Sequence, residues 1–174
     1  MFKKIAIALL TTLVLTNPAY AETWRDVLPN AKLVGQGEFR WLFFDVYTAR
    51  LWSGQKPFDV NAPFALELTY HRRITSDEFV KSSIDEIKRI FGTTWSTEKL
   101  QQWKQELTRV FPEVQAGDQL IGVYLPDRGC VFFDQNKRLA KIDDPQLARA
   151  FFAIWLDKRT RDTSLRANLL GEKK

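Results

Sequence analysis

The segment that decides the fold reads Leu33-Val-Gly-Gln-Gly-Glu-Phe-Arg-Trp-Leu-Phe-Phe-Asp-Val-Tyr-Thr-Ala-Arg-Leu-Trp52 and is the densest aromatic block of the 174-residue chain. Aromatic and β-branched residues dominate it, proline is absent from it, and its glycines stand only at its start. Such a composition predicts one long strand, or two strands joined by a tight bend. In a single strand both faces are largely apolar, so we expect both faces to be covered.

Polar side chains interrupt this aromatic block at Arg40, Asp45, Tyr47 and Arg50. A charge buried in apolar surroundings must be paired or must bind something. Two interpretations remain open. In the first, the segment is a central strand whose polar groups pair with one another or extend to water. In the second, the polar groups converge on a ligand pocket, and physical reasoning alone does not name the ligand.

The N-terminal residues have the pattern of a secretory signal peptide. Lys3 and Lys4 form a basic start, Ile5 to Thr16 an apolar run, and Ala19-Tyr20-Ala21 a cleavage site with small residues. The apolar run is shorter than the roughly 20 residues that a bilayer-spanning helix needs. We therefore expect cleavage after Ala21, a periplasmic location without a transmembrane anchor, and a single domain over residues 22–174.

Composition argues against several classes of function. The formal net charge of +5 is mild and no run of lysine or arginine stands out, so a nucleic-acid partner is not predicted. The single histidine, His71, lacks the neighbouring ligands that a zinc site needs, and glycine-rich nucleotide-binding motifs are absent from the sequence. No cofactor is therefore predicted. The single cysteine, Cys130, is predicted to be a buried, inert thiol, and the oligomeric state stays open.

The rest of the chain predicts further strands and amphipathic helices. Phe64 to His71 alternates apolar and polar residues, which predicts a strand with one polar face toward water. Thr75-Ser-Asp-Glu78 is a capping box before a helix that ends at Gly92. The later predicted elements are a helix from Ser96 to Pro112, strands over 119–125, 130–135 and 138–142, a helix opened by Asp144-Pro145, and a short helix capped by Thr163. This order indicates an α+β fold, with an antiparallel sheet and helices packed on one face.

Taken together, these segments resemble the chalcone isomerase-like family over roughly Leu28 to Gly171. The motifs that carry the resemblance are Gly35-Gln-Gly37, Phe44-Asp-Val-Tyr-Thr-Ala-Arg-Leu-Trp52, Phe64-Ala-Leu-Glu-Leu-Thr-Tyr70, Ala116-Gly-Asp-Gln-Leu120, Gly129-Cys-Val-Phe-Phe133, Phe151-Phe-Ala-Ile-Trp-Leu156 and Ser164-Leu-Arg-Ala-Asn-Leu-Leu-Gly171. The chain looks most like the bacterial secreted branch rather than the plant enzymes. The resemblance implies an open-faced sandwich, with a pocket between a large antiparallel sheet and the helices that cover it.

The resemblance also implies site residues. The plant enzymes cyclise chalcones to flavanones without a cofactor, and an arginine on the early strands is important there; Arg40 is the nearest match. Fatty-acid-binding relatives hold a carboxylate with an arginine and a tyrosine, a pattern that Arg40 and Tyr47 fit better. The resemblance thus implies a ligand site formed by Arg40, Tyr47, Phe44 and Tyr70, in which Arg40 and Tyr47 would be the catalytic residues of any reaction.

Departures from the enzymes favour binding over catalysis. The tyrosine and asparagine on the enzymes' first long helix fall at about Ser76 and Ser83, and their threonine near the penultimate helix falls at about Ala148. Positioned proton donors of this kind typically contribute about 10²–10⁴-fold to a rate. The favoured hypothesis is a non-catalytic binder of a small hydrophobic or fatty-acid-like molecule. The alternatives are an intramolecular lyase or isomerase acting on a chalcone-like conjugated ketone, and a structural or interaction protein of the envelope.

Overall fold

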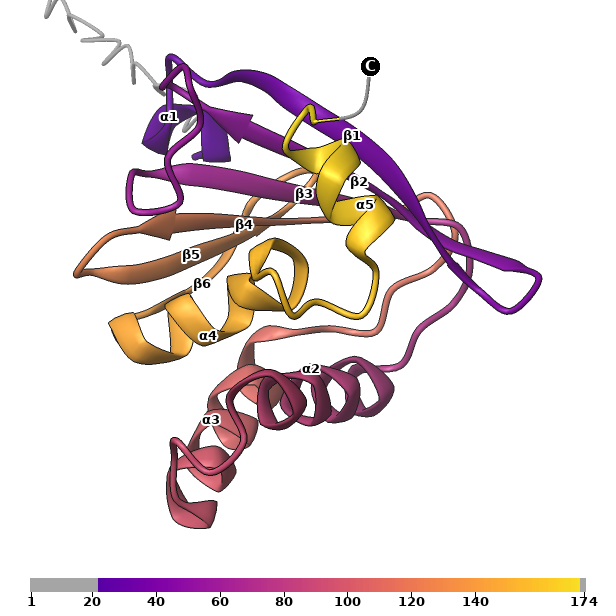
Figure 1. Cartoon of the computed structure of the whole chain (residues 1–174), viewed down its shortest axis with the longest axis vertical. Helices are drawn as coiled ribbons and strands as arrows, with labels where there is room; N and C mark the ends of the chain where they lie inside the picture. Colours follow the sequence, from indigo (N-terminus) through magenta and orange to yellow (C-terminus); the bar gives the residue numbers. More distant parts are fainter. Residues whose placement is uncertain (1–21, 173–174) are drawn as a thin grey trace, which may run out of the picture.

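The computed structural model describes residues 22–172, so the predicted signal peptide lies outside the described residues. Its antiparallel strands form one sheet in which neighbours in sequence are also neighbours in space, in the order β1-β2-β3-β4-β5-β6 (Figure 1). The strands are β1 (Lys32–Trp41), β2 (Phe44–Ser53), β3 (Phe64–Tyr70), β4 (Gln119–Leu125), β5 (Gly129–Asp134) and β6 (Arg138–Ile142). The predicted α+β class with an antiparallel sheet is confirmed.

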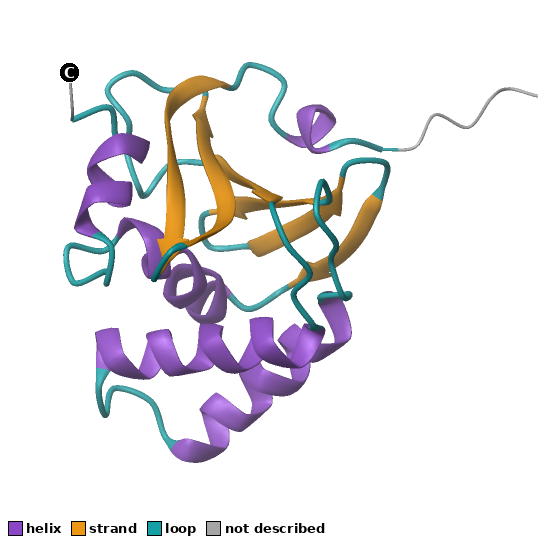
Figure 2. Ribbon diagram, turned by 90° about the vertical axis from the view of Figure 1, so that its right-hand side faces the viewer, coloured by secondary structure: helices purple, strands orange, loops and turns teal. Residues whose placement is uncertain are grey.

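The helices gather mainly on one side of this sheet (Figures 1 and 2). They are α1 (Trp24–Val27), α2 (Ser76–Phe91), α3 (Thr97–Val110), α4 (Pro145–Leu156) and α5 (Thr163–Leu169). Helix α4 packs directly on β4 and β5, α2 packs against α3 and α4, and α5 packs on β1. The short α1 lies on the opposite side of the sheet, near the start of the described chain (Figure 2). Within residues 22–172, none of the helices has the length and apolar character that crossing a bilayer requires.

The aromatic segment over residues 33–52 forms two strands, which confirms the second of the two predicted forms. Strands β1 and β2 pair as a hairpin, with Trp41 opposite Phe44 and Leu42-Phe43 as the turn. Leu42 adopts a φ of 56°, a left-handed conformation that is unfavourable for a bulky side chain. Because the chain reverses here, Arg40 and Asp45 lie near the tip of a hairpin. There they pair with each other in contact with water, as the first interpretation of the polar groups expects, although at a hairpin tip rather than in a central strand.

The sheet face on which α1 lies is more buried than expected, since the alternation of apolar and polar residues in β3 predicts that this face meets water. Glu67 is only 7% exposed, although the sequence places it on the face expected to meet water. Arg50 Nη1 donates to Glu67 Oε1 at 2.9 Å, and Trp52 Nε1 donates to Glu67 Oε2 at 3.0 Å. The ring of Trp24, from α1, lies 5.6 Å from that of Trp52. Paired in this way, a buried carboxylate on this face is tolerated.

The predicted helix starts are present in the structure. The Thr75 hydroxyl accepts from Glu78 N at 3.2 Å, and the Glu78 carboxylate accepts from Thr75 N at 2.9 Å, which completes the capping box. Asp144 caps α4, since its side chain accepts from the backbone N–H groups of Gln146 and Leu147. For α5 the cap is Asp162 rather than the predicted Thr163; its carboxylate accepts from Leu165 N at 2.8 Å. A carboxylate satisfies the free amides and also favours the positive end of the helix dipole.

The glycines that open the aromatic segment allow α5 to approach β1. A Cβ atom at Gly35 would lie 2.1 Å from the carbonyl oxygen of Asn168, far inside any contact distance. One added methyl group would therefore force the end of α5 away from the strand.

We predict that Gly35→Ala lowers the free energy of unfolding by about 2 kcal/mol or more, because the clash is with backbone and cannot be relieved by a side-chain rotation. Denaturant titration measures the loss, and hydrogen exchange in α5 should rise with it. Gly54→Ala is the matched control, since its nearest neighbour would lie 3.9 Å away, and it should leave stability unchanged. Equal stability of the two variants would contradict this account of the α5 contact.

Candidate functional site

The structure separates the residues predicted to bind a ligand into two groups. Arg40 and Phe44 lie at the tip of the β1–β2 hairpin, and the Arg40 side chain is 65% exposed. Its Nε lies 2.6 Å from Asp45 Oδ1 and its Nη2 lies 3.2 Å from Glu38 Oε2. The expectation that this guanidinium and the Tyr47 phenol share the wall of an apolar hollow is therefore wrong. The tight turn places Arg40 in solvent, where two carboxylates pair with it.

Tyr47 and Tyr70 lie together in the core, with ring centroids 5.9 Å apart. Trp155 Nε1, from α4, donates to the Tyr47 hydroxyl at 2.9 Å. The Tyr70 hydroxyl is buried without a hydrogen-bond partner among the described residues. Burial raises the pKa of both phenols above the ordinary value, so both stay protonated at neutral pH. These two side chains fill the space between the sheet and α4.

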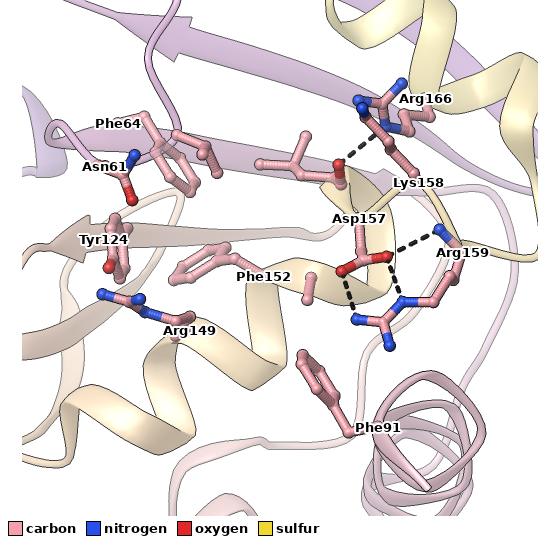
Figure 3. Close-up of a pocket in the computed structure, with 13 residues that line it drawn as sticks. Asn61, Phe64, Phe91, Tyr124, Arg149, Phe152, Asp157, Lys158, Arg159 and Arg166 are labelled. Atoms are coloured by element: carbon pink, nitrogen blue, oxygen red, sulfur yellow. Dashed lines mark hydrogen bonds and ion pairs between the residues drawn. The ribbon is translucent and has the colours of Figure 1, made fainter.

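A pocket lies toward the other end of β3 (Figure 3). It has a volume of about 710 Å³ and is lined by Val60, Asn61, Phe64, Phe91, Tyr124, Arg149, Phe152, Ala153, Leu156, Asp157, Lys158, Arg159 and Arg166. Phe64 begins β3 and Tyr70 ends it. At about 3.3 Å per residue, the backbone at these two positions is roughly 20 Å apart. The pocket and the Tyr47–Tyr70 pair are therefore distinct places in the fold.

One stripe of α4 forms a wall of this pocket. Arg149, Phe152, Ala153 and Leu156 line it and recur at intervals of three and four residues, which places them on one helical face. The Phe152 ring packs edge-on against Phe64, with 5.1 Å between centroids. The helix therefore presents aromatic surface at the base of the pocket and a guanidinium at its rim.

The facing wall comes from the sheet and from the loop over residues 54–63. Phe64 and Tyr124 stand on neighbouring strands, opposite each other in the β3–β4 register, and their rings are 5.0 Å apart. Phe58 packs edge-on against Phe64 at 5.6 Å, which holds the loop beside the pocket. Asn61 N donates to Asp59 Oδ1 at 2.9 Å, so a local turn shapes the segment that carries Asn61.

Basic side chains outnumber acidic ones at the rim, with Arg149, Lys158, Arg159 and Arg166 against Asp157. Arg159 pairs with both oxygens of Asp157, each at 2.9 Å, and holds the pKa of that carboxyl below its ordinary value. Figure 3 shows this pair beside the bond from Arg166 Nε to the carbonyl oxygen of Leu156, which measures 2.8 Å. These two arginines are thus engaged with the protein.

Arg149 and Lys158 differ from the other rim cations. Within residues 22–172, neither side chain forms a hydrogen bond or an ion pair, and both are exposed. Each can turn its charge toward a bound anion without breaking an existing contact. The arrangement combines an aromatic base with two free cations, and it suits a molecule that has an apolar body and an anionic head.

The single histidine and the single cysteine of the chain lie outside the pocket. His71 Nε2 is 2.8 Å from Thr48 Oγ1, and neither residue lines the pocket. Cys130 is buried in β5, and burial raises the pKa of its thiol, so the thiolate is suppressed. Among the described residues, no cluster of three or more histidine, cysteine, aspartate and glutamate side chains is placed to hold a metal ion.

The residues that line the pocket are difficult to identify from the sequence alone. They come from β3, β4, the loop over residues 54–63, the end of α2, α4, the segment after it and α5, so no single motif contains them. The α4 stripe is the exception. Arg149 precedes Phe152 and Leu156 at helical spacing, and a charge on an otherwise apolar face indicates either a helix end or a site.

Three comparisons place the chain among known proteins. A model of the family described as chalcone isomerase-like matches residues 26–171. A fatty-acid-binding protein of Arabidopsis thaliana, known from a crystal structure, has a similar fold, with a TM-score of 0.62 and 13% sequence identity over 90% of this chain and 91% of that chain. No curated protein sequence gives a significant match. At this identity, the similarity to the plant protein establishes the fold alone.

We predict opposite effects of removing the two core hydroxyls. Tyr47→Phe should lower the free energy of unfolding by about 1–2 kcal/mol, because Trp155 Nε1 would lose its acceptor in the core. Tyr70→Phe should leave stability unchanged or raise it slightly, since the hydroxyl it removes has no partner in the described chain. Thermal and denaturant unfolding at neutral pH measure both. A larger loss for Tyr70→Phe than for Tyr47→Phe would contradict the assigned bonding.

Proposed function

Because the chain belongs to the chalcone isomerase-like family, we propose that it is an exported, non-catalytic binding protein for a small amphipathic molecule with an apolar body and an anionic head. A fatty acid is the representative ligand. The proposed site is the pocket between α4 and the end of the β3–β4 pair that carries Phe64 and Tyr124. Arg149 and Lys158 are the proposed partners of the head group.

The observation that carries this proposal is the composition of the pocket. Its volume of about 710 Å³ falls within the range of roughly 300–1,000 Å³ that is usual for small-molecule sites. Phe64, Tyr124 and Phe152 form an aromatic floor that is almost fully buried, and the more accessible Val60, Phe91 and Ala153 supply apolar surface above it, where each buried ligand methylene contributes about 0.8 kcal/mol. Affinity should therefore rise with the length of the acyl chain until the pocket is full.

Electrostatics select the head group. The free guanidinium of Arg149 and the free ammonium of Lys158 favour a carboxylate over a neutral group of the same size. The plant protein with the similar fold is described as fatty-acid binding, which supports the same class of ligand here. Arg40 is not required, since Asp45 and Glu38 already pair with it.

The lining also supports binding without turnover. Cyclisation of an enone needs a group that takes or supplies a proton in the pocket, and such groups have a pKa near the working pH. The carboxylate that lines the pocket, Asp157, is paired with Arg159, which keeps it ionised and occupied. The two free rim groups are cations, which can orient an anion but are poorly suited to remove a proton, and the remaining phenol of the lining, Tyr124, is only 3% exposed.

The export of the protein is part of the proposal. It is supported by the signal-peptide pattern over residues 1–21 and by the expected cleavage after Ala21. The mass of the protein recovered from the periplasm of a bacterial host tests it. A mature chain that begins at Glu22 supports export, and an intact chain in the cytoplasm contradicts it.

We predict that the double substitution Arg149→Gln and Lys158→Gln weakens palmitate binding by about tenfold, since two charge-assisted contacts at a solvent-exposed rim are lost. Palmityl alcohol, which has the same chain and no charge, should bind the variant and the parent equally. Isothermal titration with both ligands measures this difference. Lys104→Gln is the control, because Lys104 is an exposed lysine of α3 outside the pocket. Equal weakening of both ligands, or no binding of either to the parent, would sink the assigned site.

A second prediction separates the binder from an isomerase. Incubation of the protein with a hydroxychalcone should give cyclisation at the rate of the buffer alone, while the same chalcone displaces palmitate if it fits the apolar pocket. Absorbance of the chalcone measures its disappearance. Cyclisation well above the buffer rate that Arg149→Gln abolishes would instead establish the lyase hypothesis.

A further inference from the structure

The tip of the β1–β2 hairpin is a run of exposed apolar side chains. Trp41, Leu42, Phe43 and Phe44 are 51%, 76%, 96% and 59% exposed. Figure 1 shows the hairpin extending past the rest of the sheet and past the helices, so the turn is the outermost point of its side of the molecule. Exposed apolar residues are ordinary when they are scattered, but consecutive ones on a protrusion mark an interaction site.

The requirements of folding do not explain the residues at this turn. A two-residue hairpin turn with a positive φ at its first position favours glycine there and a small polar residue next. The chain instead has Leu42, with a φ of 56°, followed by Phe43. These residues bury little surface within the molecule and require an unfavourable backbone conformation, so their contribution must come from outside the fold.

In the part of the chain that the structure describes, the charged side chains near the tip leave one cation unpaired beside the exposed aromatic residues. The Arg72 guanidinium lies 5.4 Å from the centroid of the Phe44 ring and forms no ion pair within residues 22–172. Arg40 is neutralised by Asp45 and Glu38 at the base of the turn. One cation without an ion pair among the described residues thus lies beside the aromatic side chain of Phe44 at the tip.

We propose that the hairpin tip inserts Leu42 and Phe43 into the boundary between head groups and acyl chains of a lipid bilayer, with Trp41 at the interface and Arg72 on a lipid phosphate. Tryptophan is enriched at that depth, and apolar side chains stabilise shallow insertion in proportion to the area they bury. A stable protein partner would need about 800 Å² of complementary surface on each side, more than a narrow turn presents. A bilayer deforms around a convex tip and needs no matching groove.

This inference goes beyond the proposed function and does not depend on it. It uses none of the residues that line the pocket, and vesicle binding is measurable without any pocket ligand. The pocket lies at the Phe64 end of β3, next to Ser53 of β2, whereas the tip lies beyond Phe44 at the opposite end of β2, so the two sites are separate along the sheet.

The test is flotation of the chain from Glu22, which contains every helix and strand described, with vesicles of phosphatidylethanolamine and phosphatidylglycerol in equal amounts. The parent should float with the vesicles, and the variant Leu42→Gly with Phe43→Asn should bind about tenfold more weakly or less. The new residues suit the existing turn, so its melting temperature should stay the same or rise. Leu33→Thr, which removes an exposed apolar side chain on β1 away from the tip, should float like the parent.

Two further measurements identify the contact. Brominated lipid should quench fluorescence in the parent more than in Trp41→Phe, because the extra quenching comes from the tip. Arg72→Gln should reduce binding to the anionic vesicles by about fivefold, and should reduce binding to phosphatidylcholine less, because the choline there offsets the charge of the phosphate. A parent that does not float, a tip variant that floats equally well, or a tip-dependent dimer in solution without vesicle binding would each overturn the proposal.

Discussion

The close approach of α4 to the sheet is the contact on which the site depends. Gly122, in the middle of β4, has no side chain, and a Cβ there would lie 2.9 Å from the Phe152 ring and 3.0 Å from Phe132. The Phe152 ring takes that space and packs against the sheet, and a close-packed interior leaves α4 little freedom to rotate about this anchor. Its orientation then places Arg149 and Leu156 at the edge of the core, where together with Phe64 and Tyr124 they line the pocket, which opens to solvent. The shape of the pocket is therefore a consequence of how α4 packs on Gly122.

The same packing accounts for why the Tyr47–Tyr70 end of the core is closed. Trp155 precedes Leu156 in α4, but its side chain points to a different face of the helix. Its Nε1 donates to the Tyr47 hydroxyl across the interface between the helix and the sheet. An aromatic side chain with a hydrogen bond at its tip fills this end, while the other end is left open between the loop over residues 54–63 and the segment after α4.

Much of the fold was predictable from local patterns, and the site was not. The alternation of apolar and polar residues predicted which side chains of β3 share a face. The starts of α2 and α4 were also predictable, because capping depends on residues that are neighbours in sequence, here Thr75 with Glu78 and Asp144 with Pro145. The β1–β2 turn was ambiguous because Leu42 and Phe43 are not turn residues. The buried Glu67 was unpredictable because its cover comes from Arg50 and Trp52, on another strand. Arg40 was assigned to the site by resemblance, whereas Arg149 required knowledge of which elements meet at the end of β3, a fact of tertiary packing.

The central claim is that an amphipathic ligand lies between α4 and the end of the β3–β4 pair that carries Phe64 and Tyr124, and not beside the buried tyrosines. Intermolecular nuclear Overhauser effects between ¹³C-labelled palmitate and the methyl groups of the protein test it most directly. The account predicts contacts from the acyl chain to Ala153, Leu156 and Val60, which line the pocket. Contacts to Leu68 and Val80, which lie in the closed part of the core, in place of those to the pocket methyl groups would contradict it.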